Sequence, residues 1–425
     1  MRVLHTADWH LGHTLRDHSR QPEHEHFLKW LVATVVERKV DALLIAGDVF
    51  DSANPPPAAW RLWFEFLGDL KRARPSLQVV VIAGNHDSAA RLEAPRELLS
   101  AFDVRVVGQV RRDAAGALAT GELVTELRDD AGQVEALCVA IPFLRGSDVM
   151  SLAGDDDSDG DEQADGADPW IEAMRRLHAE VFAAAEAQRR PGQALVAMGH
   201  GYFVGGQISE LSERKVFGGN QHALPLDLFP PACTYVALGH LHRPQLLGGR
   251  EHVRYSGSPI PLAMPEREHP HHVVFADLRG GALEKVWSLR VPRLVDLIRL
   301  PERGALEPEA ALAAVAALPE RDPQMRDDLR PLLEVAVRLP LPAPGLGEDI
   351  ARLVQHKNVR LVRVEIELAG SAPNVPGEGP QADLATLAPE EIFVRRFHRD
   401  HEGDVPDELL AAFRSLLDDV EHRGS

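Results

Sequence analysis

Five short apolar runs in this chain each end in a polar side chain of a type that binds metal ions. Residues 3–4 precede Asp8 and His10, 42–46 precede Asp48, 79–83 precede Asn85 and His86, 194–198 precede His200, and 235–238 precede His240 and His242. Their length and β-branched residues indicate buried strands of a parallel sheet. Because ligands gather beyond the carboxyl ends of such strands, we expect these side chains to form one metal site. The pattern therefore predicts an α/β fold with its chemistry at one sheet edge.

Composition limits the number of domains and the surroundings of the chain. A chain of 425 residues is longer than a domain with a single hydrophobic core usually is, so two or three domains are expected. No apolar run approaches the roughly 20 residues that cross a bilayer. Only two cysteines are present, far apart, and no signal peptide opens the sequence, so we expect a cytoplasmic protein that does not bind a membrane. The net charge of −19 argues against a generally basic nucleic-acid binder, but bound divalent cations would reverse the local field.

Strands and helices alternate over residues 1–145. Helices are expected at 22–38, 55–74 and 91–101, with a further strand at 104–107. Hairpin strands at 122–127 and 134–141 are expected to begin a second sheet, which a helix at 169–188 follows. Strands at 253–255, 272–277 and 283–289 are expected to belong to the same second sheet.

The helix at 55–74 concentrates aromatic residues in a protein with only 5% of them. It carries Trp60, Trp63, Phe64 and Phe66. Such crowding indicates either core packing or a face for self-association, and the sequence leaves both interpretations open.

Residues 154–168 hold seven Asp, one Glu and three Gly and no large apolar side chain. This composition predicts a solvated, mobile loop. Its opening, Asp155 to Gly160, is similar to an EF-hand loop, but the twelfth position is Gly166 where that motif needs Glu. We therefore do not expect a calcium site here.

The pattern changes beyond residue 291. Helices at 308–318 and 347–355 and strands at 332–339 and 359–368 predict a small separate α/β unit. A linker follows at 370–388, rich in Gly and Pro over 370–380, and helices are expected at 389–398 and 406–422, the second with one apolar stripe. That stripe either packs on this chain's own core or binds another subunit.

The strand-end residues suit a pair of divalent cations. Two ions roughly 3.5 to 4 Å apart can clamp the attacking and leaving oxygens of a displacement at phosphorus. Asp8 and His10 can bind one ion, Asp48 can bridge, and Asn85 offers a neutral oxygen. Imidazoles of His200, His240 and His242 complete the set. Carboxylate, amide and imidazole without thiolate suit manganese, iron or zinc.

Five motifs carry a resemblance to calcineurin-like metallophosphoesterases. They are Asp8-Trp9-His10, Gly47-Asp48-Val49-Phe50-Asp51, Gly84-Asn85-His86-Asp87, Gly199-His200-Gly201 and Gly239-His240-Leu241-His242. The narrower stretches 4–12, 239–245 and 254–259 resemble the SbcD family, the nuclease subunits of bacterial SbcCD complexes and counterparts of the eukaryotic Mre-eleven repair nuclease. The resemblance is strong up to about residue 290. Beyond that residue it rests only on the order of the domains along the chain. The acidic loop at 154–168 departs from the family pattern.

The resemblance implies a fold and a role for each site residue. The fold would be a four-layer α/β/β/α sandwich over 1–290, a capping domain over 291–369, a linker over 370–388 and a helical partner-docking segment over 389–425. One manganese ion would be held by Asp8, His10, Asp48 and His242, and the other by Asp48, Asn85, His200 and His240. His86 would act on the scissile phosphate as a catalytic residue, and Asp87 would orient it.

The resemblance also implies a manganese-dependent DNA nuclease, a double-strand exonuclease and single-strand or hairpin endonuclease. It would work with the ATPase SbcC in DNA repair, recombination and replication, as a homodimer within a heterotetramer. Two alternatives remain open. A small-molecule phosphodiesterase would share every ligand but would not need the parts beyond residue 290. A metal-binding scaffold without catalysis would not need a competent His86.

Overall fold

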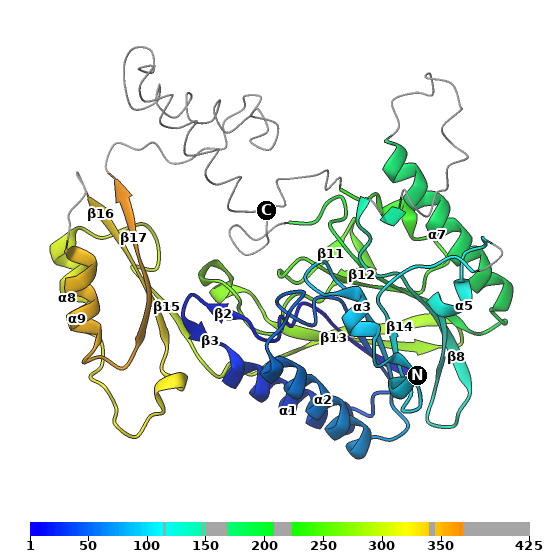
Figure 1. Ribbon diagram of the computed structural model, residues 1–425, viewed down its shortest axis with the longest axis horizontal. Coiled ribbons are helices and arrows are strands. Elements are labelled where there is room, and N and C mark those ends of the chain that lie inside the picture. The colour runs from blue at the N-terminus through cyan, green and yellow to red at the C-terminus, as the bar shows by residue number, and fades with distance from the viewer. Residues whose placement is uncertain (114–115, 147, 150–167, 208–222, 340–344, 369–425) are drawn as a thin grey trace, which may run out of the picture. The chain divides into compact units, whose positions relative to one another are not determined.

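Two six-stranded sheets form the core of the computed structural model (Figure 1). The structure describes residues 1–113, 116–146, 148–149, 168–207, 223–339 and 345–368. The first sheet has the order β14 (Ala282–Arg290), β13 (His272–Arg279), β1 (Arg2–Thr6), β4 (Ala42–Ala46), β5 (Gln78–Ile82) and β6 (Val104–Val107). The second has the order β11 (Gln245–Leu247), β12 (Arg250–Tyr255), β10 (Tyr235–Gly239), β9 (Ala194–His200), β8 (Val134–Ala140) and β7 (Val124–Arg128).

Helices cover the outer faces of both sheets. On the first sheet α1 (Gln21–Glu37) and α2 (Pro57–Ala73) bury Phe27 and Leu67 against Leu43 and Val81. On the second, α7 (Pro169–Gln188) contributes Val181 and other apolar side chains to a cluster that also fills the space between the sheets. The four layers confirm the predicted α/β/β/α sandwich.

The parallel strands explain where the site forms. Strands β1, β4, β5 and β6 run parallel in the first sheet, and β8, β9, β10 and β12 run parallel in the second. Strands β1, β4, β5, β9 and β10 are almost fully buried, because apolar side chains line both of their faces. The carboxyl ends of β1, β4, β5, β9 and β10 therefore carry the loops of the predicted site.

The assignment of strands β13 and β14 to the second sheet is wrong. Strand β13 pairs antiparallel with β1 in the first sheet, and β14 pairs with β13. Side chains on both faces of β13 are buried, with Phe275 towards the helices and Val274 towards the second sheet. Alternating polarity cannot say which of two sheets such a strand joins, because either sheet would bury it.

Smaller elements differ from the expected pattern. The helix expected at 91–101 is two short helices, α3 (Ala89–Glu93) and α4 (Arg96–Ser100), separated at Pro95, whose ring nitrogen cannot donate a hydrogen bond. Elements that the sequence reasoning missed are β2 (Thr14–Leu15), β3 (His18–Ser19), α5 (Thr120–Leu123), η2 (Leu226–Leu228), η3 (Met264–Glu268), β11, β15 (Leu297–Leu300) and η4 (Asp327–Leu329). Most are too short to show a periodic pattern.

The aromatic residues of α2 divide between core and surface. Trp63 and Phe66 are 1% and 3% exposed, and their ring centroids lie 5.8 Å and 5.3 Å from that of Trp9. These two side chains therefore belong to the core. Phe64 is 43% exposed and stacks on Trp60, so self-association through this side of α2 stays a prediction.

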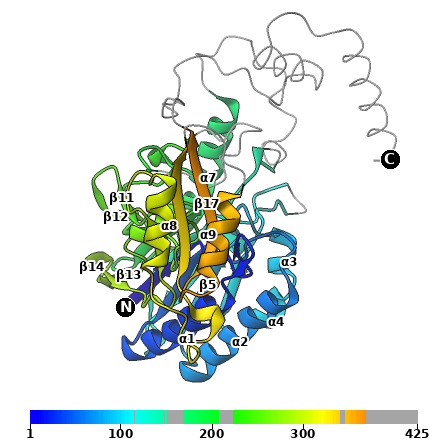
Figure 2. The same ribbon diagram turned by 90° about the vertical axis from the view of Figure 1, so that its left-hand side faces the viewer.

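A three-stranded parallel sheet lies within the residues of the predicted small α/β unit (Figure 2). Its order is β15, β16 (Leu332–Leu339) and β17 (Arg360–Leu368). Helices α8 (Pro308–Ala316) and α9 (Leu346–Val354) cover one face and form a separate apolar cluster with Val335 and Val337. The opposite face carries Glu334, which is 2% exposed and pairs with Arg299 and Arg363.

Several sequence predictions fall outside the described residues. They are the acidic loop at 154–168 except Asp168, the linker at 370–388 and the docking segment at 389–425. The carboxylate of Asp168 caps α7 by accepting a hydrogen bond from the Trp170 backbone nitrogen. None of the described helices is long and apolar enough to cross a membrane.

Candidate metal centre

Backbone conformation at the strand ends is unusual. Seven described residues other than glycine have positive φ, and four of them are predicted ligands: Asp8 (56°), His10 (50°), Asp48 (48°) and His240 (109°). Such conformations cost of order 1–3 kcal/mol each and cluster at functional sites. Glycine is needed where two of these loops touch, because an added Cβ would lie 2.2 Å from Asp48 Oδ1 at Gly84 and 1.9 Å from the Ala46 carbonyl oxygen at Gly239.

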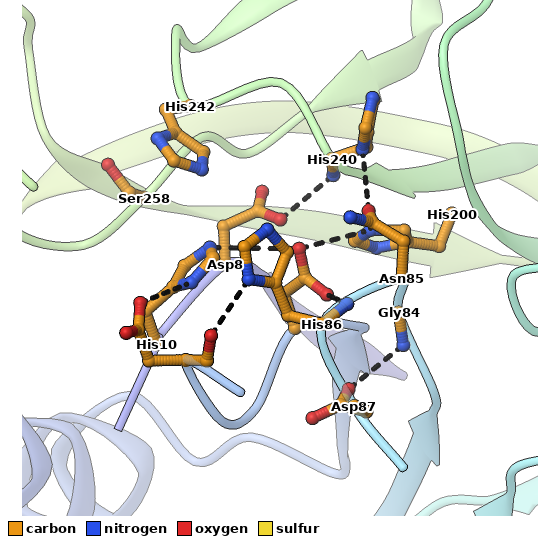
Figure 3. A network of polar contacts seen from close by, with 12 residues as sticks. Asp8, His10, Gly84, Asn85, His86, Asp87, His200, His240, His242 and Ser258 are labelled. Atoms are coloured by element: carbon orange, nitrogen blue, oxygen red, sulfur yellow. Dashed lines mark hydrogen bonds and ion pairs between the residues drawn. The ribbon is translucent and has the colours of Figure 1, made fainter. Parts of the chain in front are cut away.

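Predicted ligands from several loops converge in one place (Figure 3), and the measured distances put Asp48 among them. Its Oδ2 atom lies 3.6 Å from His10 Nε2 and 3.4 Å from His200 Nε2. Ligand atoms within 4.8 Å of one another occur in three groups: Asp8, His10 and His242; Asp8, Asp48 and His200; and His10, Asp48 and His86. The carboxylate of Asp48 therefore lies close to both histidines and belongs to two of the three groups.

Asn85 connects the remaining histidine to this cluster. Its Oδ1 atom lies 3.1 Å from His200 Nε2 and 2.9 Å from His240 Nδ1. The His240 backbone nitrogen donates to Asp8 Oδ1 at 2.9 Å. The imidazole of His240 belongs to none of the three groups found among the described residues, but it contacts Asn85 and lies edge-on to the His200 ring, with the ring centroids 5.4 Å apart. The structure thus brings all seven predicted ligands into one place.

Burial and charge set the protonation of the cluster. Burial raises the pKa of Asp8 to about 6. Burial would also raise the pKa of Asp48, but the positive charge and hydrogen bond of His200 outweigh it and hold that pKa well below its usual range. Burial would lower the pKa of His200, but Asp48 and Asp8 raise it to about 9. The same buried contact between His200 and Asp48 thus raises the pKa of the imidazole and lowers the pKa of the carboxyl.

Two buried atoms show that a metal fits. Asp8 Oδ2 and His10 Nε2 are buried and have no hydrogen-bond partner within the part of the chain that the structure describes. A buried polar atom without a partner is costly, and a coordinated cation would satisfy both. The donors are carboxylate, amide and imidazole, which suit a hard or borderline divalent ion.

His86 lies beside the cluster and remains accessible. Its backbone nitrogen donates to Asp48 Oδ1 at 2.8 Å, and its Nδ1 lies 2.8 Å from the Asp51 carbonyl oxygen. The ring centroid lies 4.7 Å from that of His10, and the residue is only half-buried. The imidazole is therefore held at the edge of the site by the loop that follows Asp48.

Asp87 has a different position from the one that the resemblance implied. Its buried carboxylate accepts hydrogen bonds from the backbone nitrogens of Gly84 (2.9 Å), Phe50 (2.9 Å) and Val49 (3.2 Å). The His86 imidazole is oriented by Asp51 instead. Asp87 therefore fixes two ligand-bearing loops to each other and does not touch the His86 ring.

Three supporting residues escaped the sequence reasoning. Asp51 Oδ1 lies 3.2 Å from His10 Nδ1 and 2.9 Å from His13 Nδ1. Glu266 Oε1 lies 2.8 Å from His242 Nδ1. Asp51 belongs to the same sequence motif as Asp48, and this motif could have indicated that Asp51 lies near the site. No spacing or motif marks His13 or Glu266.

Comparison with known proteins places the chain in a family. Calcineurin-like phosphoesterases match residues 1–244, and a second family, described as type 5 capsule protein repressor C-terminal domain, matches residues 293–401. A protein of Rhodobacter capsulatus named as the SbcD subunit of the nuclease SbcCD is 41% identical over 404 residues, which are 93% of this chain and 94% of that protein. The chain belongs to the SbcD family.

Further relatives agree with this assignment. The SbcD of Escherichia coli strain K12 is 38% identical over 295 residues, covering 69% of this chain and 68% of that protein. A protein of Aeropyrum pernix named DNA double-strand break repair protein Mre11 is 26% identical and covers 92% of this chain and 87% of its own length. SbcD membership confirms the resemblance drawn from the motifs and the class of metal-dependent phosphodiesterase.

Proposed function

We propose that this SbcD-family chain is a DNA nuclease that hydrolyses phosphodiesters at a site for two manganese ions. The observation that carries the proposal is the convergence of seven predicted ligands around the Asp48 carboxylate, next to an accessible histidine. Divalent cations held by these residues would neutralise the charge of a phosphodiester and stabilise the attacking and leaving oxygens of its displacement. A scaffold without catalysis would not need the half-buried His86.

The ligands divide into two sets. One ion would be held by Asp8, His10, Asp48 and His242, and the other by Asp48, Asn85, His200 and His240. The grouping of Asp8 with His10 and His242, and the contacts of Asn85 with His200 and His240, support this division.

His86 would act on the leaving oxygen. The Asp51 carbonyl only accepts hydrogen bonds, so the His86 Nδ1 beside it carries a hydrogen. Nε2 is then the nitrogen that would interact with the phosphodiester. When the ring is protonated, Nε2 would donate a hydrogen bond to the leaving oxygen. Asp87 acts as a positioning residue, through the loops that it fixes.

The C-terminal unit would form part of the substrate site, as a capping domain over 291–369 beside a nuclease domain over 1–290. A cavity of about 410 Å³ is lined on one side by His10, His86 and His242. Glu334, Val362 and Arg363 of the three-stranded sheet line another side. Arg363, whose Nε and Nη2 atoms pair with Glu334 and Glu365, would offer its remaining N–H donors to a phosphate near the metal centre, a contact that a small free phosphodiester does not require.

Cleavage assays with manganese test this proposal. The chain should cleave linear duplex and single-stranded DNA as well as bis-p-nitrophenyl phosphate. Arg363→Ala should lower kcat/KM for DNA about tenfold or more, because a charge-assisted hydrogen bond contributes about 1.5–3 kcal/mol, and should affect bis-p-nitrophenyl phosphate less.

Arg338→Ala is the matched control, because Arg338 lies on β16 and pairs with Glu367 but does not line the cavity. It should cleave DNA as the wild type does. Turnover of cyclic nucleotides without DNA cleavage would favour the small-molecule phosphodiesterase.

We also propose a cytoplasmic SbcCD-type assembly, in which a homodimer of this chain binds two SbcC ATPases through the segment 389–425. The names of the relatives, as SbcD subunits of SbcCD nucleases, support the partner. The exposed side chains of Phe64, Leu98 and Phe102, which are 43%, 66% and 51% exposed, support a contact between two copies.

Truncation after residue 388 tests the docking segment. The shortened chain should retain its melting temperature, its metal content and its cleavage of single-stranded DNA, but should no longer co-purify with SbcC or degrade duplex DNA in an ATP-stimulated manner. A fall in the melting temperature and basal cleavage of the shortened chain would instead show that the segment belongs to its own fold.

A further inference from the structure

A buried carboxylate lies behind one of the candidate ligands. Glu266 belongs to η3 and is 0% exposed. Its Oε1 atom lies 2.8 Å from His242 Nδ1, and its Oε2 atom accepts a hydrogen bond from the Leu262 backbone nitrogen at 2.9 Å. The Ser258 hydroxyl lies 3.4 Å from Oε2. A carboxylate taken out of water is costly unless it is paired in this manner, so this one is held by a specific set of contacts.

The backbone around Glu266 is fixed as well. Its carbonyl oxygen lies 3.0 Å from His271 Nε2, and His271 Nδ1 lies 2.9 Å from the Ser258 carbonyl oxygen. The neighbouring Met264 is 4% exposed and packs with Leu297 and other apolar side chains in a small cluster. The carboxylate therefore has little freedom to move away from His242.

This contact determines how His242 can bind a cation. An ionised carboxylate only accepts hydrogen bonds, so His242 Nδ1 carries the hydrogen and Nε2 is the nitrogen that can act as ligand. An imidazole that donates to a carboxylate is also a more basic ligand, and its ring orientation is fixed. His242 shares its ligand group with Asp8 and His10, so the effect is directed to the ion that these residues would hold.

We propose that Glu266 is a positioning residue that fixes the tautomer and orientation of His242 for the metal ion shared with Asp8 and His10. The expected effect on manganese affinity rests on the proposed two-metal centre. The tautomer of His242 in the metal-free protein does not depend on that centre, so the two ideas can fail separately.

Manganese titration by calorimetry tests the effect on affinity. Glu266→Gln keeps the size of the side chain but removes the charge, and it should bind one of the two ions about 10- to 100-fold more weakly while the other binds as in the wild type. Glu268→Gln is the matched control on the same short helix, because its side chain is 70% exposed. It should bind both ions as the wild type does. Equal affinities in wild type and Glu266→Gln would overturn the proposal.

The histidine tautomer gives a readout without metal. In EDTA, nitrogen-15 spectra of labelled histidine should show His242 with its hydrogen on Nδ1, assigned by the loss of its signals in His242→Asn. Glu266→Gln should show a mixture of tautomers, whereas an unchanged single tautomer would contradict the proposal. A wild type with this tautomer but only one bound ion would instead contradict the two-metal centre.

Folding is the remaining control. If Glu266→Gln does not fold, as judged by melting in EDTA, Glu266→Asp retains the charge but withdraws the carboxylate by one methylene. It should fold and bind the affected ion with an intermediate affinity. Wild-type affinity in a folded Glu266→Asp variant would show that the reach of Glu266 to His242 does not matter, and the proposal would fail.

Discussion

His86→Ala should keep both metal ions and lose most of its turnover, whereas Asp48→Ala should lose metal and turnover together. Asp48 lies within 3.6 Å of imidazole nitrogens on both sides, so its removal takes the bridge from both ions. His86 is assigned to the leaving oxygen, where a general acid contributes about 10²- to 10⁴-fold. Elemental analysis and kcat for bis-p-nitrophenyl phosphate, measured on the same purified variants, check both statements.

The position of His86 also allows a competing role, as a metal ligand. His86 has a ring nitrogen within the same 4.8 Å group as ligand atoms of His10 and Asp48. If His86 were itself a ligand, His86→Ala would lose about as much metal as Asp48→Ala. His252→Ala, at a half-buried histidine of β12, is the matched control and should change neither metal content nor rate.

The strand-end pattern was sufficient to predict that these side chains lie together, because it is local. Each ligand follows its own buried strand within a few residues, and parallel strands deliver their carboxyl ends to one edge. Asp48 and Asn85 could therefore be placed together although 36 residues lie between them in the chain. The same reasoning predicted the helices on the outer faces, because their apolar stripes are also local.

The pairing of strands that are far apart in the sequence could not be predicted from such local patterns. The pairing of β13 with β1 joins residues about 270 positions apart, and the ion pair between Arg2 and Asp277 accompanies it. Both faces of β13 are buried, so either sheet could have accommodated its apolar run and the sequence pattern did not identify the partner strand. Glu266 was missed for a related reason, since a carboxylate 24 residues from His242 is indistinguishable in sequence from a surface residue such as Glu268.

The role of Asp87 shows a different limit. The motif that contains it was recognised, and its position next to His86 implied that it orients that ring. In the structure the side chain accepts hydrogen bonds from backbone nitrogens of the loop that carries Asp48, and the His86 ring contacts the Asp51 carbonyl oxygen instead. Proximity in sequence indicates that a residue belongs to a site, but the direction of its side chain depends on the packing of two loops.

Asp87→Ala should consequently destabilise the protein itself and not only slow its reaction. Three buried backbone nitrogens, of Gly84, Val49 and Phe50, would lose their acceptor. Each unsatisfied buried donor costs about 1–3 kcal/mol, and water entering the space offsets part of this, so we expect a loss of about 2–4 kcal/mol in the free energy of unfolding. Urea unfolding in EDTA measures this loss without any contribution from metal.

The two loops that Asp87 joins carry Asp48 and Asn85, so metal binding should weaken in the same variant. Oδ2 accepts from both Gly84 and Val49, whereas Oδ1 accepts from Phe50 alone. Asp87→Asn with its oxygen in the Oδ2 position keeps two of the three bonds and should lose less stability than Asp87→Ala. Asp69→Ala, at a 54% exposed surface carboxylate of α2, should change stability by less than about 1 kcal/mol. A fully stable Asp87→Ala that only turns over slowly would show that Asp87 acts on the reaction and not on the loops.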